Sequence, residues 1–516
     1  MPTDPVLAAE GAAPPVSSLD VSLPKLADAA FRAPERNHET PEQPVFASPD
    51  HFPDDLDADG GSDAVPSASV ENDATEADAS AVASGTDAVQ PIPAPNDEDP
   101  VASLETTFPA PGSADATEVR LPDIFLGTSQ PSPQYGVLGQ DNLSRTVALD
   151  LNETHTISLF GVQGGGKSYT LGSIIEAATL PAPPVNQLPH PLATIVFHYS
   201  PTLDYEPEFT SMVAPNSDLS QVRDLASQYG GAPAALDNVV ILVPADQLEQ
   251  RRLEHPELTV LPLKFGPSEL RAEHWRFLMG AVGNQSTYIR QLQRIMKAHR
   301  NELRLEVIRD GVMDSGLPDN LKQLAQQRLD LAAEYIDDSA SIKDIVQPGR
   351  MIVVDLRDEF IEKDEALGLF VVLMQLFADA QRERFNKLVV FDEAHKYIDS
   401  PDLVDGLVSS VREMRHKGMS VLVASQDPPS VPIKLIELSD VVILHKFNSP
   451  AWLRHMQKAA VSLAELTPAK MASLAPGEAY VWSSKSTIAD FTHGAVRMRV
   501  RPRITRHGGD TRTAVE

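Results

Sequence analysis

The stretch from His155 to Thr170, HTISLFGVQGGGKSYT, decides the fold of this 516-residue chain. It starts with an apolar run that predicts a strand, and the apolar residues after it, from Leu171 to Ile175, recur at helical spacing. Between strand and helix lies the pattern GxxxxGKS, at residues 161–168. A strand, a glycine-rich turn and a helix in this order are typical of a phosphate-binding loop, or P-loop. The alternative, a plain glycine turn, is disfavoured by the flanking strand and helix.

The residue types of this loop suit a bound triphosphate. Glycines let successive backbone N–H groups point at phosphate oxygens, and the positive end of the helix dipole adds to the attraction. Lys167 would reach the β and γ phosphates, and the Ser168 hydroxyl would bind Mg²⁺. We therefore predict ATP and Mg²⁺ as cofactors. The residues expected to hold them are Gly161, Val162, Gln163, Gly164, Gly165, Gly166, Lys167, Ser168 and Tyr169.

A second polar signal is the pair of carboxylates that ends the run LVVFDE, residues 388–393. A P-loop enzyme needs an acid at the tip of a neighbouring strand to hold the Mg²⁺ shell, and Asp392 fits that role. Glu393 fits the base that orients or polarises the attacking water. Two adjacent acids at a strand end are by themselves equally typical of a solvated turn. Together with the loop at 161–168 they predict a metal ligand and a catalytic carboxylate.

Two further candidates follow in the chain. Gln426 ends the apolar run at 421–425, where nucleotide-driven motors place a polar residue that senses the γ-phosphate, although a polar pair also simply ends many strands. The basic cluster VREMRHKGM, from Val411 to Met419, is either a helix end favoured by its dipole or the source of an arginine finger. Such a finger would reach the γ-phosphate bound by a neighbouring subunit. Arg415 and Arg412 both remain candidates for it.

The order of apolar segments predicts an α/β fold with a mainly parallel sheet, because strands alternate with helices and most strands are apolar throughout. The predicted strands after the P-loop cover 193–198, 239–244, 258–265, 351–358, 388–393, 421–425, 441–447 and 480–484. We expect five segments: a disordered acidic tail (1–118), a short β-rich segment (119–154), the first part of an ATPase core (155–267), a helical insertion (268–346), and the second part of the core with a basic C-terminal tail (347–516).

Charge and composition set limits on the class of protein. Residues 1–118 hold 24 acidic and 3 basic residues, so −21 of the net charge of −30 falls there and −9 on the remainder. That tail cannot bury enough apolar surface to offset its chain entropy, and one interpretation is that it imitates DNA. The chain has no cysteine, which excludes disulfides and thiolate metal sites. The apolar runs are too short for a membrane span and the start lacks an export signal, which together predict a cytoplasmic protein.

Two basic groups have open interpretations. On a helix predicted near 286–304, the residues Arg290, Arg294, Lys297 and Arg304 share one face, which is either solvated or a nucleic-acid contact. The C-terminal stretch RMRVRPRITRHGGDTR is either a solvated tail, or it contacts phosphates in a pore or lines a subunit seam. Its arginines are Arg497, Arg499, Arg501, Arg503, Arg506 and Arg512.

The order GxxxxGKS, apolar-DEAH, RxKG, apolar-SQ resembles the FtsK–HerA superfamily of ring ATPases, and most closely the HerA-like branch. The matching stretches are GVQGGGKSYTLGSIIE, VVFDEAHKYI, MRHKGMSVLVASQDP and VVILHKFNSPAWL. The resemblance runs from about Gln134 to the C-terminus. It implies a RecA-like core, a homohexameric ring and ATP-driven movement of double-stranded DNA. It also implies that Lys167 and Ser168 are Walker A residues, Asp392 and Glu393 Walker B residues, Gln426 the polar sensor and Arg415 the candidate finger.

The sequence differs from the HerA pattern at its start. The segment 119–154 is short for the N-terminal β-barrel of that family, and an acidic tail precedes it. Because of these differences, the sequence does not indicate how the chain would contact a nuclease or defence-system partner. DEAH does not indicate a DEAH-box RNA helicase, because the Ser-Ala-Thr motif and second RecA-like lobe of those proteins are missing. We expect an ATP-hydrolysing DNA motor; the alternative is a nucleotide-switched scaffold in a multi-protein complex that moves no DNA.

Overall fold

The computed structural model describes residues 121–280, 287–300, 303–380, 385–398 and 401–509. All of them belong to one unit, Phe108–Glu516. The predicted disordered tail, 1–118, and Arg512 lie outside the described residues. The segment boundaries proposed at 118, 154, 267 and 346 stay predictions.

Eight neighbouring parallel strands, from β12 to the edge strand β8, form the larger part of a single sheet. Their order is β12-β4-β11-β10-β6-β9-β7-β8, and every neighbouring pair is parallel. The strands are β12 (Val441–His445), β4 (Thr156–Phe160), β11 (Met419–Ser425), β10 (Lys387–Phe391), β6 (Ala193–Ser200), β9 (Met351–Arg357), β7 (Val239–Val243) and β8 (Thr259–Pro262). β4, β6, β7, β9, β10, β11 and β12 are buried along their whole length, as expected for strands covered on both faces. The predicted fold class, a RecA-like P-loop α/β fold with a mainly parallel sheet, is confirmed.

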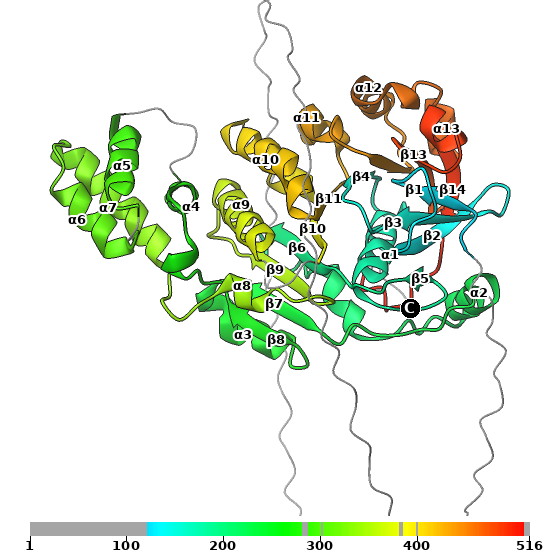
Figure 1. Cartoon of the computed structure of the whole chain (residues 1–516), viewed down its shortest axis with the longest axis horizontal. Coiled ribbons are helices and arrows are strands. Elements are labelled where there is room, and N and C mark those ends of the chain that lie inside the picture. Colours follow the sequence, from blue (N-terminus) through cyan, green and yellow to red (C-terminus); the bar gives the residue numbers. More distant parts are fainter. Residues whose placement is uncertain (1–120, 281–286, 301–302, 381–384, 399–400, 510–516) are drawn as a thin grey trace, which may run out of the picture. The chain divides into compact units, whose positions relative to one another are not determined.

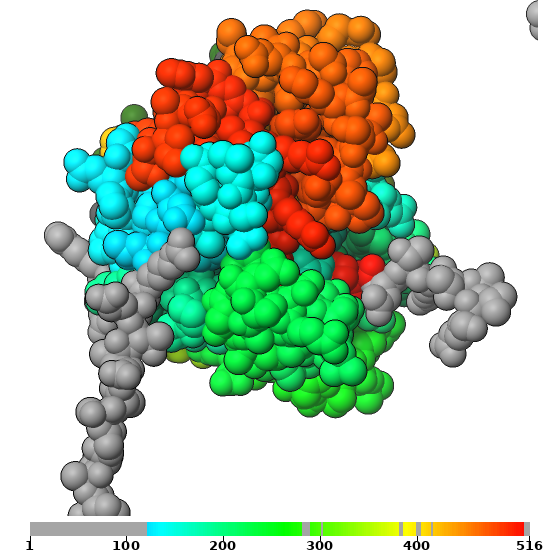
Figure 2. All heavy atoms as spheres, turned by 90° about the vertical axis from the view of Figure 1, so that its right-hand side faces the viewer, coloured from blue at the N-terminus to red at the C-terminus, as the bar shows by residue number. Residues whose placement is uncertain are grey.

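Antiparallel strands extend this sheet beyond β12. They are β13 (Glu478–Ser483), β14 (Val496–Val500), β2 (Tyr135–Asp141) and β3 (Thr146–Asp150), with β1 (Ile124–Leu126) and the short β5 (Asn186–Gln187) at their side. β14 pairs with β2, so the C-terminal residues lie beside the first strands (red and cyan in Figure 2). Gly139 allows this approach, because a Cβ there would lie 2.0 Å from the carbonyl oxygen of Arg499.

Helices cover both faces of the parallel strands (Figure 1). On one face α1 (Lys167–Thr179) packs Leu171 and Ile174 into the same apolar cluster as β4. On the other face lie α9 (Lys363–Asp379) and α10 (Pro401–Met414). α9 is apolar on nearly all sides because it is buried on nearly all sides, and its Phe370 stacks on Phe197 of β6 with ring centroids 4.5 Å apart. Each such buried side chain stabilises the fold by about 1.5–3 kcal/mol.

Between β8 and β9 the described residues are largely helical (green to yellow-green in Figure 1). The helices are α4 (Ala272–Leu278), α5 (Thr287–Ala298), α6 (Leu305–Met313), α7 (Asp319–Ala333) and α8 (Ile342–Ile345). The prediction that Arg304 shares a helix with Arg290 is wrong, because α5 ends at Ala298 and Arg304 is the N-cap of α6. The chain starts a second helix, α6, and this helix buries the side chains of Ile308 and Val312.

The remaining helices connect strands or lie at the edges of the sheet. They are α2 (Leu219–Tyr229), α3 (Leu248–Glu254), α11 (Ile433–Ile436), α12 (Pro450–Ala459), α13 (Pro468–Ala472) and α14 (Asp490–His493). Within the described ranges, none of the helices is both long and apolar enough to span a bilayer.

Candidate active site

Three neighbouring strands bring the predicted polar residues together. β4, β11 and β10 are adjacent and parallel, so their carboxyl ends lie on one edge of the sheet. The P-loop follows β4, Gln426 follows β11, and Asp392 and Glu393 follow β10. Lys167 Nζ lies 2.7 Å from Glu393 Oε1 and 3.7 Å from Asp392 Oδ1. Gln426 Nε2 donates a hydrogen bond of 2.8 Å to the same oxygen of Glu393.

The P-loop leaves the start of α1 open to an anion. Gly166 is the N-cap residue with φ +103°, a left-handed conformation that favours glycine, and no side chain caps the helix. The first turn of α1 contains no acidic residue. The first N–H groups of this helix therefore have no internal acceptor, which makes them donors to phosphate oxygens.

His445 at the end of β12 supports the loop from one side. A Cβ at Gly161 would lie 2.6 Å from the Cβ of His445, so glycine is required for this close packing. Burial lowers the pKa of His445 to about 4, so its ring is neutral at pH 7. The neutral ring connects the loop helix to the sheet: Nδ1 donates to the carbonyl of Glu478 (2.9 Å), and Nε2 accepts from Thr170 Oγ1 (2.8 Å).

The charges of the site are buried and compensate one another. Lys167, Asp392 and Glu393 are each 5% exposed or less. Burial alone would lower the pKa of Lys167, but Asp392 and Glu393 outweigh burial and raise this pKa. Burial alone would raise the pKa of Asp392, but Lys167 and His198 hold it below its usual value. At neutral pH the site therefore holds an ammonium group and ionised Asp392.

Asp392 keeps an oxygen available for a further ligand. Its Oδ1 is buried and accepts no hydrogen bond from the described residues, although its neighbour Lys167 is 3.7 Å away. Carboxylate and hydroxyl oxygens are the ligands that Mg²⁺ prefers, and Ser168 supplies a hydroxyl one residue after Lys167. No group of three or more acidic or histidine side chains that could hold a metal occurs among the described residues. The Asp392 carboxylate and the Ser168 hydroxyl are the oxygens that could hold Mg²⁺, together with oxygens of a bound triphosphate and water.

Glu393 has an unusual backbone. Its φ of +47° and ψ of +44° are left-handed, which is rare for a residue with a side chain. Such a conformation costs about 1–3 kcal/mol and is retained where the surroundings enforce it. The hydrogen bonds from Lys167 and Gln426 hold the side chain. The hydroxyl of Tyr397, four residues later, donates to the carbonyl of Asp392 (2.9 Å).

A cavity of about 780 Å³ opens above the P-loop. Its lining includes Lys167, Ser168 and Gln426, and its size suits a nucleotide. Other parts of the wall come from an acidic segment at 204–208, from α2 and from a C-terminal segment at 499–509. Sequence reasoning found the P-loop side of the cavity. It gave no role to His445, although this residue lies in the matching stretch VVILHKFNSPAWL, and it did not place the other walls beside the P-loop.

For two of the C-terminal arginines, neither the solvated tail nor the phosphate contact predicted from the sequence is correct. Arg501 and Arg503 are fully buried, neither solvated nor free to contact DNA. Both pair with Glu176 of α1: Arg501 Nη1 at 2.9 Å and Arg503 Nε at 3.3 Å. Glu176 also accepts from the backbone N–H of Thr505 (2.8 Å). Gly172 makes room for the second guanidinium, because a Cβ there would lie 2.5 Å from Arg503 Cζ.

The other C-terminal arginines differ from this pair. Arg497 forms an ion pair of 2.5 Å with Glu478, and Arg499 lines the cavity. Arg506 is exposed. Within β14, Met498 and Val500 are buried and Arg497 and Arg499 are exposed. Arg501 and Arg503 lie beyond the end of this strand, where Glu176 is their buried partner.

The arginine finger stays a prediction. Arg415 begins a short 3-10 turn after α10, but its side chain lies outside the described residues. Arg412 is exposed and is not part of the cavity wall. Lys417 of the same cluster pairs with Asp379 at 2.8 Å.

Comparisons with known proteins give distant structural likenesses. No family model matches the chain, and no curated protein matches its sequence. Among solved structures, VirB4 of Thermoanaerobacter pseudethanolicus aligns at 12% identity over 72% of this chain and 97% of that one, with a TM-score of 0.46. The genome packaging NTPase B204 from Sulfolobus turreted icosahedral virus 2 aligns at 12% identity, 67% and 97% coverage and a TM-score of 0.31. The bacterial conjugative coupling protein TrwBΔN70 aligns at 12% identity, 69% and 85% coverage and a TM-score of 0.43.

Because each of these TM-scores is below 0.5, the class of the protein rests on its own fold and site. Three features define a P-loop nucleoside triphosphatase: a mainly parallel sheet, a glycine-rich loop that opens a helix, and a lysine that contacts two carboxylates at the end of β10, two strands away from β4. Within that class, the order of the motifs resembles the FtsK–HerA superfamily.

Proposed function

We propose that this chain is an ATPase whose hydrolysis drives movement of double-stranded DNA, and that it works as a homohexameric ring like HerA-type translocases. The observation that carries the ATPase is the meeting of Lys167, Asp392, Glu393 and Gln426 at the ends of three adjacent strands. The order of the motifs supports the other two parts of the proposal, namely DNA as the substrate and assembly into a ring.

Lys167 and the P-loop bind the triphosphate. The open N–H groups of α1 donate to phosphate oxygens, and the ammonium group of Lys167 binds the β and γ phosphates. Lys167 contacts Glu393 in this structure, so triphosphate binding draws the ammonium group toward the phosphates. Ser168 and Asp392 hold Mg²⁺, which neutralises charge on the β and γ phosphates when it is bound.

Glu393 orients the water that attacks the γ-phosphate and accepts its proton at a carboxylate oxygen. The amide of Gln426 donates to Oε1 of Glu393, so the proposed γ-phosphate sensor is in direct contact with the proposed base. The neighbouring subunit of the ring supplies the arginine finger that reaches the γ-phosphate, and Arg415 is the candidate for this residue.

Two substitutions test the ATPase. Lys167→Ala should abolish nucleotide binding, whereas Glu393→Gln should bind ATP and lose about 10²–10⁴-fold in turnover. Glu153→Gln removes an exposed acid that pairs with Lys485 and does not line the cavity, so this matched control should hydrolyse ATP normally. Normal turnover in Glu393→Gln would contradict the assigned base.

Translocation needs a separate measurement. Double-stranded DNA should stimulate the ATPase of the assembled oligomer, and the oligomer should displace a triplex-forming strand in an ATP-dependent manner. The alternative, a nucleotide-switched scaffold, predicts that ATP changes assembly while no triplex is displaced. Mass measurement with and without an ATP analogue shows the ring size.

A further inference from the structure

We infer that the outer face of α5 binds the phosphate backbone of double-stranded DNA through Arg290, Arg294, Lys297 and Arg300. This inference rests on the proposed function in taking DNA as the substrate. It adds a surface, remote in sequence from the nucleotide motifs, on which the DNA would lie.

The two faces of α5 differ completely. Ile289, Leu292, Ile295 and Met296 are each 8% exposed or less and belong to the main apolar cluster. Arg290, Gln293, Arg294 and Lys297 occupy the opposite face and are all exposed. The apolar face fixes the helix to its neighbours, so the basic side chains project from a rigid support.

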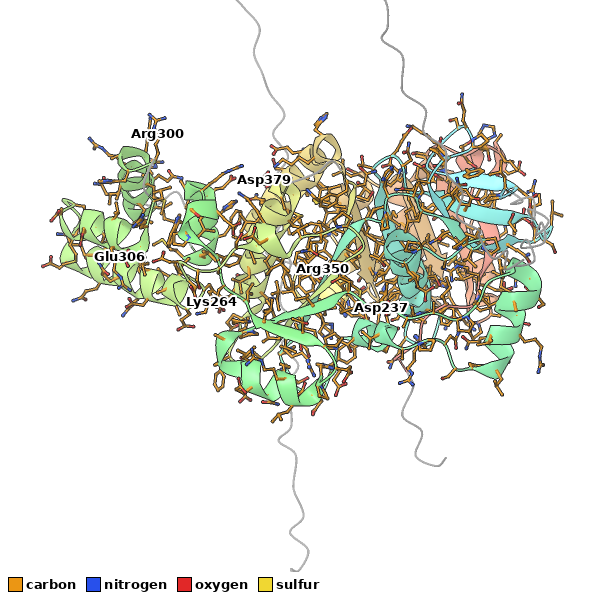
Figure 3. All side chains as sticks on the ribbon, turned by 60° about the horizontal axis from the view of Figure 1, so that its bottom comes forward. Asp237, Lys264, Arg300, Glu306, Arg350 and Asp379 are labelled. Atoms are coloured by element: carbon orange, nitrogen blue, oxygen red, sulfur yellow. The ribbon has the colours of Figure 1, made fainter. Side chains whose placement is uncertain are left out.

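The helix itself supplies no negative charge to this face. The sequence of α5, TYIRQLQRIMKA, contains no acidic residue, and Arg300 follows two residues after its end. Arg294, Lys297 and Arg300 form no ion pair with any described residue. Other arginines of the same helical group are paired, Arg271 with Asp379 and Arg309 with Asp330. Arg300 projects outward just after α5, away from Glu306 (Figure 3).

The spacing of the basic residues suits a phosphate chain. With a rise of about 1.5 Å per residue, Arg290 and Lys297 lie about 10 Å apart along the helix. Each DNA strand carries a phosphate for about every 3.4 Å of its axis, so this face spans about three phosphates. Guanidinium and ammonium groups are the side chains that bind phosphate oxygens and position DNA without reading its sequence.

An anionic membrane surface would also attract these charges. A helix that lies in a membrane interface needs an apolar face free to enter the lipid. The apolar face of α5 is already buried within the protein, with Leu292 and Met296 fully so. The observations therefore favour DNA.

The test compares two charge-matched triple variants. Arg294→Gln, Lys297→Gln and Arg300→Gln together should lower affinity for a 30-base-pair duplex by about 10²-fold near 0.1 M salt, and should reduce the slope of log K against log salt by about 2–3. Arg252→Gln, Lys434→Gln and Lys485→Gln remove the same charge from other exposed positions and should leave the slope nearly unchanged. The full-length protein is titrated by fluorescence anisotropy from 50 to 200 mM salt.

The outcomes separate this inference from the proposed function. If the unmodified protein binds no duplex at any salt concentration, this result contradicts both DNA as the substrate and the α5 surface. Two outcomes would overturn only the α5 surface, provided that the unmodified protein binds duplex. In the first, the α5 variant has the same slope of log K against log salt as the unmodified protein. In the second, both triple variants reduce this slope by the same amount. Binding to phosphatidylserine vesicles through α5 without binding to duplex would overturn it as well. ATP hydrolysis without DNA should be the same in all three proteins, which shows that each is folded.

Discussion

Two arginine-rich regions of this chain have opposite surroundings. On α5 the arginines are exposed, whereas in the C-terminal segment 501–503 both arginines are fully buried against Glu176. The two regions look alike in sequence, since each is a run of basic residues among apolar ones. The difference teaches that the position of a carboxylate in another element, not the number of arginines, decides whether a basic segment is buried.

The energetic reason is the cost of burying a charge. An ion loses several kcal/mol of hydration inside a protein, and only a well-placed opposite charge offsets that loss. Glu176 provides this partner from α1, more than 320 residues earlier in the chain. Burial alone would raise the pKa of Glu176, but Arg501 and Arg503 hold it below its usual value, so the carboxylate is ionised. No carboxylate on α5 itself could play this part.

Removal of the shared carboxylate should have the largest effect. Glu176→Gln leaves two buried guanidinium groups without their main counter-charge, and the free energy of unfolding should fall by about 3–5 kcal/mol. Urea unfolding followed by circular dichroism measures it. Glu153→Gln breaks an exposed ion pair with Lys485 and should cost about 1 kcal/mol or less. Equal losses in the two variants would show that the buried cluster is no stronger than a surface pair.

A smaller effect is expected where α1 makes room for Arg503. In Gly172→Ala the new methyl group would lie 2.5 Å from Arg503 Cζ, and the resulting shift should cost about 1–3 kcal/mol despite the better helix propensity of alanine. Gly406→Ala in α10 is the matched control, because its nearest contact is an ordinary 3.4 Å. That variant should be slightly more stable. Thermal unfolding of both proteins would show the opposite signs.

The smallest effect on stability is expected on α5. Arg294→Gln and Lys297→Gln remove exposed charges that have no ion-pair partner among the described residues, so each should change the free energy of unfolding by about 0.5 kcal/mol or less. The same urea titration measures it. A loss above 1 kcal/mol would indicate that these side chains stabilise the fold, and the contrast with Arg501 would disappear.

Much of the fold was predictable because strands and helices leave a periodic pattern. The strand ends near Phe160, Phe391 and Ser425 were found from apolar runs followed by polar residues. The boundary after Ala298 was missed, because the basic pattern continues through Arg304 although the chain turns to bury Ile308 from a new helix. The cavity wall around Arg499 was also missed, because it depends on β14 pairing with β2.

The sequence by itself determined that a triphosphate loop, a pair of carboxylates and a polar residue would follow three apolar strands, since each of these is a local pattern. Only the tertiary structure decided that β11 lies between the other two strands, which brings Gln426 and Lys167 to the same oxygen of Glu393. It also decided which arginines are buried. The strand order and the burial of these arginines both depend on contacts between residues hundreds of positions apart. Such contacts are set by packing and charge compensation, which a local sequence pattern does not reveal.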